Sequence, residues 1–132
     1  MSENPLSPPL ELNVFGDGAI FDHVGVAVRN IREGMLTDLS VISDETQNVT
    51  VGFVEINGVR VEMIEPLGEN SPIDSSLEKG QRLVHLCYQV PDIDSAIEQS
   101  REYGFHCIQK PVPATAFGGK NIAWLFSRIY GL

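Results

Sequence analysis

The sequence has no long apolar run and no apolar leader. No stretch approaches the roughly 18 consecutive apolar residues that a membrane-spanning helix needs. Residues 1–9 are polar and rich in proline, without the basic start and apolar stretch of a secretory signal. We therefore expect a cytoplasmic protein that does not bind membranes.

Basic residues are also scarce, with 9 Lys and Arg against 18 Asp and Glu and a net charge of −9. Nucleic acids and anionic membranes attract proteins through patches of positive charge. The acidic balance therefore predicts that neither is a partner, and it is compatible with the binding of a cation.

Cysteine is limited to 2 residues, Cys87 and Cys107, each within an apolar, strand-like run. Buried free thiols in a reducing cytoplasm are the favoured state. A disulfide stays open as an alternative if the strands that carry the two residues are neighbours.

What the sequence does contain is a repeated pattern around two histidines, His23 and His85. Each follows an apolar residue and one spacer, and precedes a five-residue run ending in Val, one spacer, Asn or Asp, and then Ile. The two copies lie about half the chain apart, which indicates an internal duplication. Equivalent positions of a duplicated fold meet around a pseudo-twofold axis, so the two histidines could share one site.

The first half begins with a predicted strand over 20–28. Alternation places His23, Gly25 and Ala27 on one face and three valines on the other, which we expect to lie under a helix. Asn30 is a suitable cap for that helix, which we expect to be short. The small residues beside His23 leave room on its face for another group.

A hairpin is predicted over residues 49–65, because Asn57-Gly58 is a strong two-residue turn signal between alternating runs. On its return strand Arg60, Glu62 and Ile64 share a face. Glu62 is thus a carboxylate in the middle of a strand, flanked by apolar residues.

The second half repeats the plan, with a strand over 83–90 that places His85, Cys87 and Gln89 on one face. The remaining expected elements are a helical turn near Ile73 to Leu77, a helix capped by Asp92 and stopped by Gly104, a strand over 105–109, a loop over 111–119 and a strand over 121–126. We predict an N-terminal arm over 1–18 and a single domain over 19–132. Its first module spans about 19–66, a linker 67–82, and the second module about 83–132.

His23, Glu62 and His85 form a candidate metal site on strands of both halves. Two imidazoles and one carboxylate suit a divalent Zn, Co, Ni, Mn or Fe ion. The alternative is that each is an ordinary polar residue on a half-buried strand.

Two further candidates each have a simpler alternative. Glu45 could be a general base that reaches a metal-bound substrate, or part of a solvated polar loop. Gly118, Gly119 and Lys120 could bind an anionic part of the substrate through backbone N–H groups and the lysine charge, or form a plain turn. Trp124 is expected in the core or lining a cavity.

These residues resemble the vicinal oxygen chelate superfamily of glyoxalases and bleomycin-resistance proteins, and within it the methylmalonyl-CoA epimerases. The matching segments are Phe21–Val28, Val61–Ile73, His85–Ile93 and Gly118–Leu125. The second segment is the most specific, because it runs from the strand of Glu62 through Pro66-Leu67-Gly68 to Ser71-Pro72-Ile73.

The resemblance implies an α+β fold in which paired βαβββ modules form a cupped mixed sheet. It implies a metal held by a His and a Glu or Gln from each module, and His23, Glu62 and His85 fill three of those four positions. It also implies an acyl-CoA substrate, whose carbonyl oxygens the metal binds, and proton transfer at the adjacent carbon.

The sequence departs from the family in two places. The family's fourth ligand is a Glu in a last strand that would follow Leu132, so we expect that strand to be truncated here. A neighbouring chain or water could supply the ligand instead, or no metal binds. An open sheet edge left there predicts a homodimer. The stretch between Ile31 and Val49, where the family has its first helix and a catalytic Glu, is shorter than usual, and Glu45 lies nearest to that Glu.

The sequence therefore favours a metal-dependent epimerase, isomerase or lyase that acts on a small acyl thioester or oxo acid. The alternative is a metal-free binding protein that holds an acyl group, an acyl carrier protein or an antibiotic. An iron-dependent dioxygenase of the same superfamily is a third possibility, against which the short chain argues.

Overall fold

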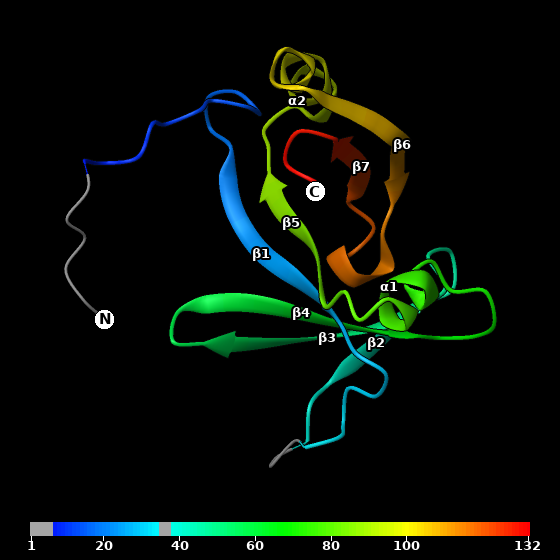
Figure 1. Ribbon diagram of the computed structural model, residues 1–132. Helices are drawn as coiled ribbons and strands as arrows, with labels where there is room; N and C mark the ends of the chain where they lie inside the picture. The colour runs from blue at the N-terminus through cyan, green and yellow to red at the C-terminus, as the bar shows by residue number, and fades with distance from the viewer. Residues whose placement is uncertain (1–6, 35–37) are drawn as a thin grey trace.

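The computed structural model describes residues 7–34 and 38–132, which form two sheets and few helices (Figure 1). The strands are β1 (Ile20–Ala27), β2 (Val41–Asp44), β3 (Val49–Ile56), β4 (Val59–Pro66), β5 (Leu83–Gln89), β6 (Phe105–Pro113) and β7 (Asn121–Ser127). The helices are α1 (Asp74–Glu78), α2 (Ile93–Ser100) and the short 3₁₀ segments η1 (Arg101–Tyr103) and η2 (Thr115–Phe117). This arrangement confirms the predicted α+β class.

The larger sheet is mixed and has the strand order β2-β3-β4-β1-β5. Strand β1 runs parallel to β4 and antiparallel to β5, so it joins the two halves of the chain within one sheet. Strands β6 and β7 pair with each other in a second sheet. In Figure 1 they lie beside β5, and α2 lies across one end of them.

Several predicted local features are present. Asn57 and Gly58 have positive φ values of 47° and 89°, as the two-residue turn of the β3–β4 hairpin requires. The Asp92 side chain accepts hydrogen bonds from the backbone N–H groups of Asp94 and Ser95 and caps α2. After η1, Gly104 takes a left-handed φ of 86°, which ends the helical segment.

The helix expected after Asn30 is not found in the part of the chain that the structure describes. Residues 31–34 form a turn, because Gly34 takes a left-handed φ of 80° that an α-helix cannot continue. Residues 35–37 of the expected helix lie outside the described residues. The valines of β1 therefore pack against a cluster of Ile31, Val61 and Met63 instead of under a helix.

The loop expected over 111–119 was also partly wrong, because β6 continues to Pro113. The pairing with β7 is irregular between Gln109 and Val112, and then resumes as Val112 meets Ile122. The residue patterns alone did not indicate strand β2, although the βαβββ module implied by the resemblance includes a strand at this place. Its residues pair with β3 from Val41 to Asp44.

Apolar clusters form on both faces of the large sheet. The cluster of Ile31, Val61 and Met63 lies on the face of the β1 valines. A second cluster lies on the opposite face, and its buried members are Ala27, Val49, Val51, Ile64, Ile73 and Leu77. This face is also the face of His23 and Glu62, so the candidate site lies at the border of a packed core.

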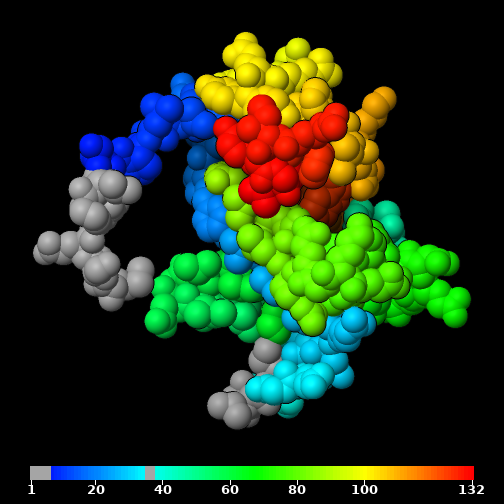
Figure 2. All heavy atoms as spheres, in the orientation of Figure 1, coloured from blue at the N-terminus to red at the C-terminus, as the bar shows by residue number. Residues whose placement is uncertain are grey.

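The first described residues extend away from the rest of the molecule (Figure 2), and Leu10 is 85% exposed. Phe15, in contrast, packs against Tyr88 and Phe105 with ring centroids 5.1 and 5.6 Å apart. In the ranges 7–34 and 38–132, no helix has the length and apolar character needed to cross a membrane.

Candidate metal centre

Three neighbouring strands bring His23, Glu62 and His85 together. His23 lies on β1, Glu62 on β4 and His85 on β5, with β1 between the other two strands. Gly25 of β1 pairs with Glu62 on one side and with His85 on the other. The duplicated histidine pattern therefore does place both imidazoles at one point of the sheet.

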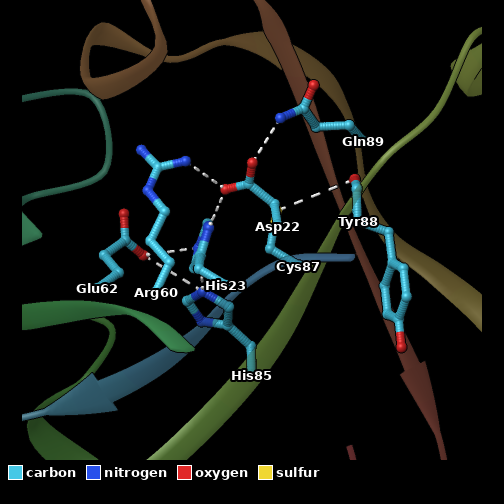
Figure 3. Close-up of polar contacts among 8 residues, drawn as sticks. All are labelled: Asp22, His23, Arg60, Glu62, His85, Cys87, Tyr88 and Gln89. Carbon is cyan, nitrogen blue, oxygen red and sulfur yellow. Dashed lines mark hydrogen bonds and ion pairs between the residues drawn. The ribbon is translucent and has the colours of Figure 1, made fainter. Parts of the chain in front are cut away.

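The functional atoms of this triad face one another (Figure 3). His85 Nε2 lies 3.3 Å from His23 Nε2 and 3.3 Å from Glu62 Oε1. The remaining distance, from His23 Nε2 to Glu62 Oε1, is 3.5 Å. His23 and Glu62 are only 1% and 6% exposed, so the triad is largely withdrawn from water.

This spacing fits a divalent ion. Ligand atoms about 2.1 Å from a tetrahedral ion lie about 3.4 Å from one another. The observed separations of 3.3 to 3.5 Å match that value without movement of the side chains. Two imidazole nitrogens and one carboxylate oxygen are also donors that Zn²⁺ and related ions accept.

The charges of the triad are strongly coupled. Burial alone would lower the pKa of the His23 imidazole, but interactions with Cys87, Glu62 and Asp22 raise this pKa to about 10. Burial would likewise raise the pKa of the Glu62 carboxyl group, but hydrogen bonds with His23 and His85 lower this pKa to about 2. These pKa shifts favour an ionised Glu62 carboxylate beside a protonated His23 imidazole, and a bound cation would replace the proton.

Three aromatic rings contact the histidines of the triad. The Phe117 ring stacks on His23 at 5.8 Å with an angle of 17° between the planes, and Phe53 meets the same imidazole edge-on at 5.4 Å. Trp124, which is half-buried on β7, approaches His85 edge-on at 4.8 Å. These rings exclude water and strengthen electrostatic interactions at the triad.

Sequence reasoning missed Asp22, Phe117 and Arg60 as parts of this site. Asp22 Oδ2 lies 2.6 Å from His23 Nδ1, and Arg60 Nη1 donates to the same oxygen at 2.9 Å. Burial would raise the pKa of Asp22, but hydrogen bonds with His23 and Gln89 lower it. The only signal for Asp22 in the sequence is its place directly before His23. Strand alternation argues against a contact, because it places the side chains of neighbouring residues on opposite faces of the sheet.

Glu45 lies outside this group of residues. It is exposed in the turn after β2, which ends at Asp44. Asp44 pairs with Val49, and Val49 pairs with Pro66, four residues beyond Glu62 on β4. With strands about 4.8 Å apart and residues about 3.4 Å apart along them, Asp44 lies about 17 Å from Glu62. The geometry thus favours the solvated loop that was the alternative for Glu45.

The backbone N–H groups of Gly118, Gly119 and Lys120 donate hydrogen bonds to carbonyl groups of the residues just before them. Gly118 donates to Thr115, Gly119 to Ala114 and Lys120 to Phe117, at 3.2, 2.9 and 3.3 Å. These N–H groups already have acceptors, so a plain turn describes the backbone. The Lys120 side chain is exposed, and it is the part of this turn that remains open to a ligand.

The two cysteines are free thiols, as expected, although both are half-buried and not fully buried. The Cys87 Sγ atom lies within 4.8 Å of ligand atoms of Asp22 and His23. Cys107 lies on β6, in the other sheet.

The chain is similar to known proteins over most of its length. The sequence profile of the glyoxalase/bleomycin resistance protein/dioxygenase superfamily matches residues 22–124. The ethylmalonyl-CoA/methylmalonyl-CoA epimerase of Cereibacter sphaeroides is 31% identical over 114 residues, which cover 79% of this chain and 85% of that protein.

Solved structures show the same likeness. A hypothetical protein from Bacillus halodurans is 30% identical, with a TM-score of 0.69 over 88% of this chain and 91% of that one. The methylmalonyl-CoA epimerase of Mycobacterium tuberculosis has a TM-score of 0.64 at 20% identity, over 80% of this chain and 77% of that one. At the latter identity the likeness shows the fold alone.

Proposed function

Because this chain belongs to the glyoxalase/bleomycin resistance protein/dioxygenase superfamily, we propose that it is a metal-dependent enzyme that moves a proton next to a carbonyl group. The membership confirms the resemblance found in the sequence. The observation that carries the proposal is the triad of His23, Glu62 and His85, whose atoms have the mutual spacing of metal ligands.

His23, Glu62 and His85 would hold the ion. A divalent ion bound there supplies a Lewis acid that polarises a carbonyl oxygen and so acidifies the neighbouring C–H bond. The three side chains fix the place of that charge, and Phe53 and Phe117 keep water away from it. In such an environment the developing negative charge of the substrate is stabilised more strongly than in water.

We propose a small acyl-CoA as the substrate, with an oxo acid as the alternative substrate class. The Cereibacter sphaeroides relative is named as an epimerase of ethylmalonyl-CoA and methylmalonyl-CoA, which supports this substrate class. Lys120 is exposed three residues after Phe117, and we propose that its charge contacts the phosphates of coenzyme A. Its contribution would therefore be to binding and not to proton transfer.

A second candidate function is that of a metal-free binding protein. Every buried side-chain N and O atom of the described residues has a hydrogen-bond partner. The triad is thus satisfied by its own hydrogen bonds, and the fold does not require an ion to compensate for buried charge. In that case the same site would hold an acyl group, an acyl carrier protein or an antibiotic.

Metal content distinguishes the two functions. We would measure it by elemental mass spectrometry in the purified protein, before and after incubation with Co²⁺, Ni²⁺ and Zn²⁺, and in the variants His23→Ala and His85→Ala. His106→Ala is the matched control, because His106 is exposed on β6 outside the triad. Near-stoichiometric metal that only the two triad variants lose supports the enzyme.

The next assay would follow deuterium from solvent into methylmalonyl-CoA. Incorporation that depends on the metal and on both histidines supports proton transfer next to the carbonyl. A protein that stays free of metal after incubation with all three ions contradicts the proposed enzyme and leaves the binding protein.

A further inference from the structure

Asp22 and His23 are consecutive residues of β1 whose side chains nevertheless meet. In a regular strand, neighbouring side chains point to opposite faces of the sheet. Here the pairing with β5 shifts, since Phe21 faces Tyr88 while His23 faces Cys87. Two steps along β1 thus correspond to one step along β5, and Asp22 is the extra residue of a β-bulge.

The bulge brings the Asp22 carboxylate within 2.6 Å of His23 Nδ1 (Figure 3). The Asp22 side chain is only 7% exposed. Bulges commonly redirect a side chain near a functional site. This one moves a carboxylate from the valine face toward the histidine that the triad uses.

Two other side chains hold the Asp22 carboxylate in place. Arg60 Nη1 donates to Oδ2 at 2.9 Å, and the Gln89 amide donates to Oδ1. Arg60 is itself positioned over the Phe53 ring, 4.3 Å from its centroid. Both oxygens of Asp22 therefore have partners from β4 and β5, the strands on either side of β1.

We propose that Asp22 is a positioning residue, which holds the N–H group of His23 Nδ1 and thereby directs Nε2 toward Glu62 and His85. A carboxylate paired with arginine only accepts hydrogen bonds, so the proton of this contact resides on Nδ1. The nitrogen left to bind a cation is then Nε2, which is the atom that faces the triad. Carboxylates in this position fix the tautomer and the ring orientation of metal-binding histidines.

This inference rests on the proposed metal site, but its first test does not need a metal. In the metal-free protein, we expect a His23 Nδ1–H resonance that exchanges slowly with solvent in proton NMR spectra of ¹⁵N-histidine-labelled protein. His23→Ala assigns the resonance, and Asp22→Ala and Asp22→Asn should remove it or accelerate its exchange at least tenfold. Asp17→Ala is the control, since Asp17 binds Asn13 at the surface.

The second test is a Co²⁺ titration of the same variants. Loss of a carboxylate that orients a metal-binding histidine typically weakens metal affinity by about 10- to 100-fold. We expect that loss for Asp22→Ala, a smaller loss for Asp22→Asn, and none for Asp17→Ala. If Asp22→Ala does not fold, Asp22→Asn decides, because it keeps the size of the side chain and removes the charge.

The two tests can fail separately. A wild-type protein that binds no Co²⁺ but shows the protected Nδ1–H contradicts the proposed function and leaves the positioning role standing. Unchanged Nδ1–H exchange in Asp22→Asn overturns the positioning role. In a wild-type protein that does bind Co²⁺, unchanged Co²⁺ affinity in both Asp22 variants overturns it as well.

Discussion

Gly25 determines how closely the residues of the triad approach one another. It pairs with both Glu62 and His85, and a Cβ atom at this position would lie 2.2 to 2.5 Å from three atoms of the His85 ring. No such contact is tolerated, so the imidazole would have to move. The absence of a side chain at Gly25 is therefore a condition for the site.

We predict that Gly25→Ala displaces His85 and lowers Co²⁺ affinity at least tenfold. Titration of Gly25→Ala, His85→Ala and the double variant tests this cause. If the loss arises through His85, the double variant binds no more weakly than His85→Ala alone. Additive losses would assign the effect of Gly25→Ala to another part of the site.

For Glu45 we predict that substitution has little effect on the chemistry. A general base typically contributes a factor of about 100 to 10,000 to the rate. Because Glu45 is exposed in a turn remote from Glu62, Glu45→Gln should leave deuterium exchange into methylmalonyl-CoA within about twofold of the wild-type rate. A drop of about 100-fold or more at unchanged metal content would restore Glu45 as the base.

At the scale of elements, α2 is held at its beginning by Asp92. The side chain accepts from Asp94 N at 3.1 Å and from Ser95 N at 3.2 Å. Asp92→Ala should lower the free energy of unfolding by about 1 kcal/mol. Urea denaturation measures it, with Ser95→Ala as a control that leaves the cap intact. Equal stability of wild type and Asp92→Ala would contradict the capping role.

The η2 segment depends on a contact with β2. Asp44 is 3% exposed, and its Oδ2 accepts from Thr115 N at 3.3 Å, two residues before the Phe117 ring that stacks on His23. A residue of the first half of the chain thus holds a segment of the second half over the triad.

We predict that Asp44→Ala increases backbone hydrogen exchange in residues 114–120, because Thr115 N–H loses its acceptor. An unpaired buried group of this kind costs about 1–3 kcal/mol. Hydrogen–deuterium exchange with peptide resolution measures the effect. Ser43→Ala is the control, since this hydroxyl group bonds Thr50 of β3 and not η2. Equal exchange in both variants would show that Asp44 does not hold the segment.

At the scale of the whole molecule, four strands of the described residues have one open edge, namely β2, β5, β6 and β7, and both β5 and β7 carry exposed apolar side chains. Among the described residues, β5 pairs only with β1 and β7 only with β6. Their exposed apolar side chains include Leu83, Leu86, Tyr88 and Phe126. Open edges with apolar side chains promote pairing with another chain, so the homodimer predicted from the sequence remains our proposal.

Analytical ultracentrifugation over a range of protein concentrations tests the dimer. We expect the wild-type protein to dimerise and Leu86→Lys to shift it toward monomer, because the charge lies on the open strand. Ile56→Lys is the control, since Ile56 is 60% exposed on β3, an interior strand of the large sheet. A wild-type protein that is monomeric at every concentration contradicts the proposal.

Local patterns in the sequence predicted several strands, the hairpin turn and the cap of α2. Strand alternation grouped His23 with Ala27 within one strand and Glu62 with Ile64 within another, Asn57-Gly58 predicted the hairpin, and Asp92 predicted the beginning of α2. These features depend on residues close together in the chain, so the sequence alone was enough to predict them.

Which groups meet depends on the tertiary structure. The order β4-β1-β5 places Gly25 between Glu62 and His85, and the β1–β5 register shift turns Asp22 toward His23. The fold likewise separates Glu45 from the triad and brings Phe117 onto it. Strand order, bulges and loop contacts depend on pairings between distant segments, and no local periodicity encodes those pairings.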